Sequence, residues 1–227
     1  MALDYIAFER IISLIKTKIE KGKIVKISQI SNEEFLFIIR KENYNYNLLV
    51  STHPNMSYIN LISKKPESNH INTNLLMLLR KHLENGIVEE VSQQNDDRIV
   101  LLKITNRDDY FNSTNHKLFI ELIGKAANLI LVNNDNVIID SLKKIPLAYQ
   151  NIRTIQQGVH YTFPLKVKEE QIPYDVLNEL NYRNITINEF KNLVFQSDDI
   201  YISIKDNKTD FHFVPLTFMG NEVTKYE

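Results

Sequence analysis

The sequence contains no cysteine and no tryptophan, and only five glycines and six prolines among its 227 residues. The absence of cysteine excludes disulfides, thiolate zinc sites, iron–sulfur clusters and cysteine nucleophiles. The low glycine and proline content excludes collagen-like and glycine-rich disordered chains. No apolar run reaches the roughly 18 residues that a membrane-spanning helix needs. Charged residues interrupt the apolar pattern of the first fourteen residues, unlike a secretory signal, so we expect a cytoplasmic protein with no membrane partner.

Neither sign of charge dominates, since 27 Lys and Arg face 28 Asp and Glu for a net charge of −1. A stand-alone nucleic-acid-binding domain is usually strongly basic. The balance is uneven along the chain, however, because residues 163–227 hold 7 basic and 11 acidic residues, whereas residues 1–162 hold 20 basic and 17 acidic residues.

The length suits one large domain or two small ones, and we expect a division into residues 1–164 and 165–227.

Hydrophobic periodicity predicts an α+β fold. Apolar residues at helical spacing predict helices over residues 4–20 and 75–85, with Asp4 as an N-cap and Gly86 as a C′ residue. Short β-branched and aromatic runs predict nine strands, at residues 23–30, 34–40, 46–51, 57–63, 87–92, 98–104, 117–123, 127–132 and 137–142. For the last part we expect helices over 169–181 and 188–194, a hairpin of strands 200–204 and 211–216 around a loop at 205–210, and an irregular polar tail.

Local signatures of catalysis and cofactor binding are missing from the sequence. No two of the six histidines are three or four residues apart, so there is no helical metal-binding pair. GxGxxG, P-loop and GxSxG motifs are absent, and no nucleophile has a base beside it in the sequence. We therefore expect no catalytic residue, no metal site and no cofactor.

Asp97 and Arg98 lie in a predicted turn between two strands. One interpretation is structural, because Asn and Asp are common in such turns. The other is functional: Asp97 pairs with Arg98 or positions it, and the planar guanidinium meets a phosphate or a base edge.

Two further polar segments allow the same pair of interpretations. Arg80 and Lys81 form either the outer face of an ordinary surface helix or a contact surface for an RNA backbone. A Gly-Lys step, Gly124 and Lys125, lies between two apolar runs, and Glu121 is at the end of the first run. That step is either a structural turn or a place where a carboxylate, a lysine and backbone amides are exposed together.

The order and spacing of these segments resemble the N-terminal domain of the NFACT family. The segments that carry the resemblance are residues 1–4 (MALD), 22–29 (GKIVKISQ), 48–55 (LLVSTHPN), 80–86 (RKHLENG), 96–98 (DDR), 121–132 (ELIGKAANLILV) and 151–161 (NIRTIQQGVHY). Each motif is weak by itself, but seven in register extend over most of the chain. Tyr5 stands where the family usually has glycine, and Ala126 and Ala127 replace a common His-Ser pair.

The resemblance implies a factor of ribosome-associated quality control. Such a factor binds tRNA, alanine tRNA in bacteria, and the large ribosomal subunit that still holds a peptidyl-tRNA. It supports the C-terminal alanine tailing of stalled chains. Peptide bonds are then formed by ribosomal RNA, so the protein is not an enzyme. The resemblance ties tRNA binding to Asp97, Arg98, residues 121–123 (Glu121, Leu122 and Ile123) and Asp4. It also implies a core similar to the N-terminal domain of formamidopyrimidine-DNA glycosylases.

Three alternatives to a complete quality-control factor follow from the same residues. A surface adhesin for fibronectin or fibrinogen is suggested by the older names of family members. A glycosylase-like enzyme would need a terminal nucleophile, and residues 1–4 contain no proline. A shortened protein is the third, because the chain ends about where the family's coiled coil is expected to begin.

Overall fold

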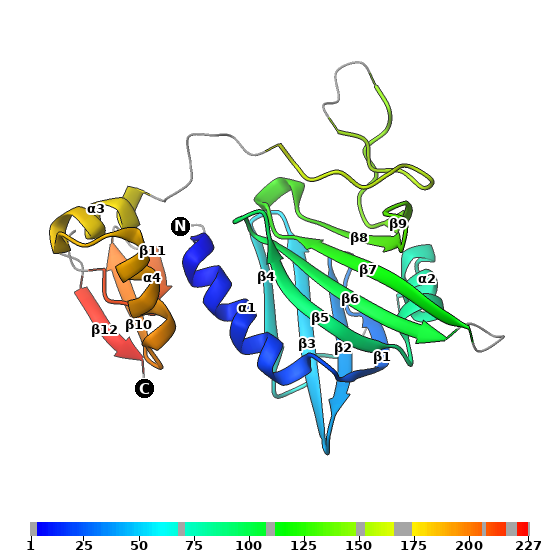
Figure 1. Ribbon diagram of the computed structural model, residues 1–227, viewed down its shortest axis with the longest axis horizontal. Helices are drawn as coiled ribbons and strands as arrows, with labels where there is room; N and C mark the ends of the chain where they lie inside the picture. Colours follow the sequence, from blue (N-terminus) through cyan, green and yellow to red (C-terminus); the bar gives the residue numbers. More distant parts are fainter. Residues whose placement is uncertain are drawn as a thin grey trace. The chain divides into compact units, whose positions relative to one another are not determined.

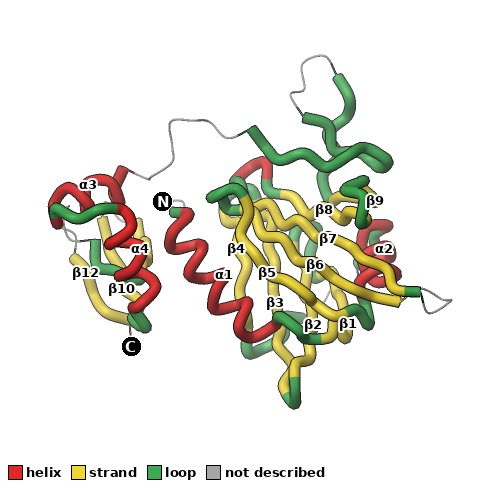
Figure 2. The backbone as a smooth tube through the Cα atoms, viewed as in Figure 1, coloured by secondary structure: helices red, strands yellow, loops and turns green. Residues whose placement is uncertain are grey.

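The computed structural model describes residues 4–67, 71–107, 112–148, 153–165, 174–205, 208–216 and 222–226. These residues form two compact units, of which the larger is Ile12–Pro164 (Figures 1 and 2). The smaller unit joins Met1–Ile11 to Leu165–Glu227. The boundary expected at residue 164 agrees with this division. The expectation that residues 1–164 form one unit differs from it, because the first eleven residues belong with the C-terminal part.

The larger unit is built on one antiparallel sheet of nine strands, in the order β4-β3-β2-β1-β5-β6-β7-β8-β9. The strands are β1 (Lys23–Gln29), β2 (Glu34–Lys41), β3 (Tyr44–His53), β4 (Met56–Ile62), β5 (Ile87–Gln94), β6 (Ile99–Arg107), β7 (Ser113–Glu121), β8 (Asn128–Asn133) and β9 (Ile138–Ser141). All nine strands predicted for this part are confirmed, and so is the α+β class. A short 3₁₀ helix, η1 (Gly124–Ala126), links β7 to β8.

The sheet consists of two meanders that meet at β1 and β5 through a single residue pair, Lys23 and Ile87. Gly22 and Gly86 lie at this junction, and a Cβ on either would come within 2.7 Å of another side chain. These side chains are Ile39 of β2 and Ile104 of β6, so the chain passes close against both strands and has room only for glycine at the two places. The expectation that Gly86 is the C′ residue of its helix is wrong by one position, because Asn85 takes the left-handed conformation (φ 69°).

The helix α2 (Asn74–Leu83) begins at Thr73, whose hydroxyl accepts the amide hydrogen of Leu76. Its leucines Leu75, Leu76, Leu79 and Leu83 are buried. The helix contacts β1, β6 and β9, which are not neighbours in the sheet. The sheet must therefore curl, and Figure 1 shows β5 to β8 in front of β1 to β3. Both faces of β2 are covered, since Phe35, Phe37, Leu36 and Ile38 are all buried.

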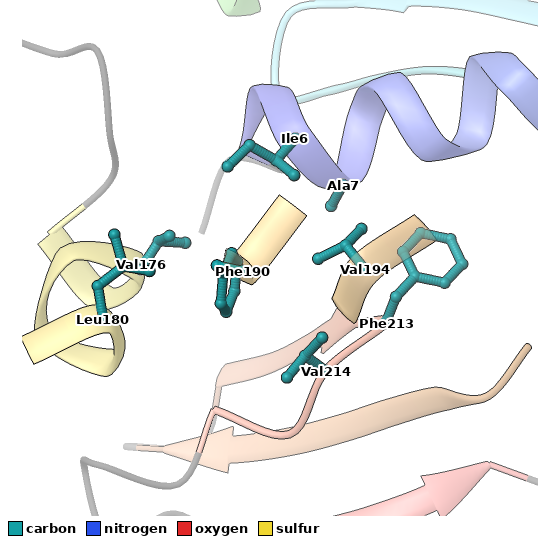
Figure 3. Packing of buried hydrophobic residues seen from close by; sticks show 8 residues of the cluster. All are labelled: Ile6, Ala7, Val176, Leu180, Phe190, Val194, Phe213 and Val214. Carbon is teal, nitrogen blue, oxygen red and sulfur yellow. The ribbon is translucent and has the colours of Figure 1, made fainter. Parts of the chain in front are cut away.

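The smaller unit contains the first turns of α1 (Tyr5–Ile19), the helices α3 (Tyr174–Arg183) and α4 (Ile187–Gln196), and the strands β10 (Ile200–Lys205), β11 (Lys208–His212) and β12 (Glu222–Tyr226). The strands form a sheet in the order β11-β10-β12. Its core gathers Ile6 and Ala7 of α1, Val176 and Leu180 of α3, Phe190 and Val194 of α4, and Phe213 and Val214 (Figure 3).

The expectations for the C-terminal part can be compared with the structure. The loop expected at residues 205–210 is too long and the strand expected at 211–216 is placed too late, because β11 spans Lys208–His212 and already pairs at Lys208 with Lys205. The tail expected to be irregular contains β12, which pairs with β10. The helix expected over 169–181 is described from Tyr174 on, and residues 169–173 lie outside the described residues. The helix expected over 188–194 is confirmed as α4.

Candidate functional site

The turn between β5 and β6 has a fixed shape. Asn95 and Asp96 take positive φ angles of 61° and 46°, which Asn and Asp tolerate better than most residues. The amide of Asp97 donates to the carbonyl of Gln94 (3.1 Å), and the carboxylate of Asp97 accepts the amide hydrogen of Arg98 (2.7 Å). Asp97 therefore positions the backbone of Arg98 and does not pair with its guanidinium.

Arg98 is tied down by its backbone on both sides. Besides the bond from its amide, its carbonyl accepts the amide hydrogen of Leu122 at 2.8 Å. Within the described residues, its guanidinium makes no hydrogen bond or ion pair. The result is a half-buried arginine on a rigid turn with all of its side-chain donors available to a ligand.

Glu121, at the end of β7, occupies a different environment. Its side chain is 2% exposed, and Arg153 binds both carboxylate oxygens at 2.9 and 2.6 Å. The hydroxyl of Tyr161 donates to the same carboxylate at 2.8 Å. Burial first, and then the neighbouring Glu121, raise the pKa of Tyr161, so this hydroxyl stays protonated. Glu121 thereby fastens the segment carrying Arg153 and Tyr161 onto the sheet.

Arg153 and Tyr161 are site residues for which the sequence interpretation assigned no role, although both lie in one of the quoted motifs. Tyr161 stacks on Phe119 of β7 with ring centroids 3.8 Å apart, and Arg153 lies over the Tyr161 ring at 5.2 Å. The available signal was that residues 151–161, one of the segments that carry the family resemblance, contain an arginine and a tyrosine. Only the fold reveals that all three side chains meet.

The loop after Glu121 combines buried and exposed residues. Leu122 is 1% exposed, so its side chain belongs to the core, while Ile123 is partly buried against the cluster that contains Ile99 of β6 and Phe119 of β7. Gly124 takes a positive φ of 48°, and Lys125 follows with an exposed side chain. The carbonyl of Leu122 accepts a hydrogen bond from Ser57 of β4 at 3.2 Å.

Asp4 belongs to the smaller unit and is buried there. Its Oδ1 accepts the amide hydrogens of Ile6 and Ala7, both at 2.9 Å, which makes it the N-cap of α1 as expected. Its Oδ2 lies 3.0 Å from Nε2 of His212, whose Nδ1 accepts the amide hydrogen of Val214. Burial acts to raise the pKa of Asp4, but His212 and the two amides outweigh it and hold that pKa below its usual value.

Arg80 and Lys81 lie far from Arg98 along the sheet. Asn106, near the end of β6, donates to the carbonyls of His82 and Glu84, whereas Arg98 directly precedes the same strand. Eight residues of strand correspond to about 26 Å. Arg80 also donates from Nε to the carbonyl of Ile27 (3.0 Å), while Lys81 is exposed.

Two histidines meet beside α2. The rings of His82 and His116 lie 4.6 Å apart at their centroids, and Nδ1 of His116 is buried without a hydrogen-bond partner in the described part of the chain. Burial, and next the charge of His82, lower the pKa of His116 to about 4.

The described residues contain no cluster of three metal-binding side chains, and no described helix has the length and hydrophobicity for a membrane crossing.

Solved structures with the same fold exist. The chain matches the N-terminal part of the fibronectin/fibrinogen-binding protein from Streptococcus suis with a TM-score of 0.82 and 22% identity, over 95% of this chain and 91% of that one. It matches the fibrinogen binding protein from Staphylococcus aureus with a TM-score of 0.75 and 24% identity, over 100% and 96% of the two chains. At these identities the likeness establishes the fold alone.

Curated relatives are similar in sequence. The chain is 36% identical to the Rqc2 homolog RqcH of Bacillus subtilis over 148 residues, and 29% identical to the protein of the same name from Streptococcus suis over 201 residues. These matches cover 65% and 86% of this chain but only 26% and 36% of the relatives, so the chain spans about a third or less of their length. The family model described as NFACT N-terminal and middle domains matches residues 4–196, and the chain therefore belongs to the NFACT family.

Proposed function

We propose that this chain is the tRNA-binding part of a ribosome-associated quality control factor that acts on the obstructed large ribosomal subunit. The observation that carries the proposal is Arg98. Its backbone is fixed by Asp97 and Leu122, and its guanidinium has no partner in the described residues. A preorganised arginine with free donors suits bidentate binding of a phosphate or a base edge. The similarity to proteins named RqcH supports the same proposal.

The residues implied in tRNA binding then have different roles. Arg98 contacts RNA, Asp97 holds Arg98 in place, and Lys125 adds an exposed positive charge on the neighbouring loop. Glu121 and Leu122 act from inside the fold, because both residues are buried. The role in C-terminal alanine tailing requires no catalytic group from this chain, since peptide bonds would be formed by ribosomal RNA.

The direct test of this function is to sequence the RNA that co-purifies with the chain at low salt. Enrichment of tRNA, alanine tRNA above all, is the expected result. Sedimentation of a cell lysate provides the second test, in which the protein is expected in the fractions of the large ribosomal subunit. Total RNA without tRNA enrichment, together with sedimentation away from ribosomes, would contradict the proposal.

Binding of fibronectin or fibrinogen is the second candidate function, and it is favoured by the descriptions of the structural neighbours. Surface plasmon resonance with each immobilised host protein tests it, with Arg98→Ala as the comparison. Equal binding by both forms would separate an adhesin surface from the proposed tRNA surface.

A core similar to the glycosylase N-terminal domain remains a prediction, and borohydride trapping on abasic DNA would reveal the corresponding enzyme activity.

A further inference from the structure

Lys143, just after β9, is held differently from the lysines that form ion pairs. Those pairs place a carboxylate against Lys16, Lys21, Lys103, Lys144, Lys191 and Lys225. The ammonium of Lys143 instead lies 3.5 Å from the carbonyl oxygen of Thr52 and 3.5 Å from that of Lys125. No acidic side chain of the described residues pairs with it. Long contacts to carbonyl dipoles orient the ammonium but leave its positive charge uncompensated.

The backbone of Lys143 is fixed by Asn128 at the start of β8. The amide side chain of Asn128 accepts the Lys143 amide hydrogen at 2.9 Å and donates to the Lys143 carbonyl at 2.8 Å. The hydroxyl of Ser141 donates to the same carbonyl at 3.1 Å. Asn128 is itself 2% exposed, so this frame is part of the core. A residue held in this way loses little conformational freedom when it binds a ligand.

The two carbonyls beside Lys143 belong to segments that are also linked to Arg98. Thr52 lies in β3, and Lys125 lies in η1, three residues after Leu122. Leu122 connects these segments to Arg98, because its amide donates to the carbonyl of Arg98 and its carbonyl accepts from Ser57 of β4. The cations of Arg98, Lys125 and Lys143 therefore lie on connected segments at one end of the sheet, and none of them is paired with a carboxylate of the described residues.

We propose that Lys143 binds a backbone phosphate of RNA, on the surface that also presents Arg98 and Lys125. This inference rests on the proposed function and adds a specific ligand to it. Three cations without carboxylate partners at one end of the sheet make the local potential positive, and a positive potential attracts the phosphate groups of RNA. A phosphate neutralised by a lysine also releases condensed counterions, so each such contact adds to the salt dependence of binding.

Lys144 provides a matched control, because it is the next residue, carries the same charge and pairs with Asp140. The test compares Lys143→Met with Lys144→Met in the whole chain, measuring binding of labelled alanine tRNA over a series of salt concentrations. For Lys143→Met we expect an affinity loss of about fivefold or more, and a slope of log affinity against log salt that is smaller by about one. For Lys144→Met we expect less than a twofold change. Lys143→Arg keeps the charge and is expected to retain most of the affinity.

Equal effects of the two methionine variants, with a normal loss of binding in Arg98→Ala, would overturn the role of Lys143 and leave the proposed function intact. No loss in Arg98→Ala would instead contradict the proposed function. If Lys143→Met lowers the melting temperature, Lys143→Gln decides the question, because its amide can still donate to the two carbonyls without a charge. Full tRNA affinity of Lys143→Gln would overturn the inference.

Discussion

Arg153 binds both oxygens of the Glu121 carboxylate, at 2.9 and 2.6 Å, where the two side chains are 13% and 2% exposed. Arg153 lies 32 residues after Glu121 in the sequence, so the ion pair attaches the segment that carries Arg153 to the end of β7. Glu121 directly precedes Leu122, whose amide donates to the carbonyl of Arg98, so the shape of the candidate site depends on this buried ion pair.

We expect Glu121→Gln to destabilise the domain by about 3–5 kcal/mol, because it leaves the charge of Arg153 buried without its partner. Urea unfolding measures this loss. The control is Glu89→Gln, which removes an exposed pair with Lys21 and is expected to change stability little. If Glu121→Gln folded with normal stability yet lost tRNA affinity, Glu121 would be a direct ligand and not a structural clamp.

For Asp4 we expect a structural role as well. Asp4→Ala removes the N-cap of α1 and the partner of His212, and should cost about 2–4 kcal/mol in unfolding free energy. Asp4→Asn keeps a capping oxygen, so its loss should be smaller. Calorimetry gives both values, and tRNA affinity measured well below the melting temperature should be unchanged. A stable Asp4→Asn variant that no longer binds tRNA would contradict this assignment.

The contact between buried His116 and half-buried His82 should make stability depend on pH. The folded state holds the pKa of His116 at about 4, compared with 6.5 for a free histidine, and burial followed by the charge of Lys81 lowers the pKa of His82. The unfolded chain therefore binds protons first as the pH falls. Stability is fully present above pH 6.5 and is lost progressively towards pH 4, by up to about 3 kcal/mol from His116. Unfolding curves of His116→Gln should show a weaker pH dependence, and identical pH profiles would disprove the effect.

Lys81 and Arg98 should respond differently to the length of the RNA. They lie near opposite ends of β6, so a trinucleotide is too short to reach both. We expect Lys81→Ala to leave trinucleotide binding unchanged and to lower the salt slope for intact tRNA by at most about one. Fluorescence anisotropy with both ligands is the measurement. Loss of trinucleotide binding in Lys81→Ala would place the two residues in one site.

Much of the fold follows from local sequence patterns. The strands of the larger unit are β-branched and aromatic runs separated by polar turns, and α2 combines four buried leucines with a Thr73 cap. The strand β12 could not be found in this way, because its residues Glu222–Tyr226 are mostly polar and gain their conformation by pairing with β10. Periodicity also cannot reveal that the first residues of α1 pack with α3 and α4.

The candidate site was predictable only in part. Turn-forming residues and a neighbouring arginine made Asp97 and Arg98 candidates because these features are local, and the resemblance to the NFACT family tied the two residues to tRNA binding. The partners of Glu121 and Asp4 lie 32 and 208 residues away, and only the fold brings Arg153 and His212 to them. A sequence therefore shows that a motif contains a carboxylate. It does not show whether that carboxylate is exposed to a ligand or forms a buried ion pair inside the protein.

The most direct test of the account is the affinity of Arg98→Ala for alanine tRNA, compared with Arg107→Ala at the other end of β6. We expect Arg98→Ala to bind about tenfold more weakly, with a nearly unchanged melting temperature, because the guanidinium makes no hydrogen bond or ion pair within the described residues. Arg107→Ala should bind normally or nearly so. Unchanged tRNA affinity of a well-folded Arg98→Ala variant would contradict the central claim.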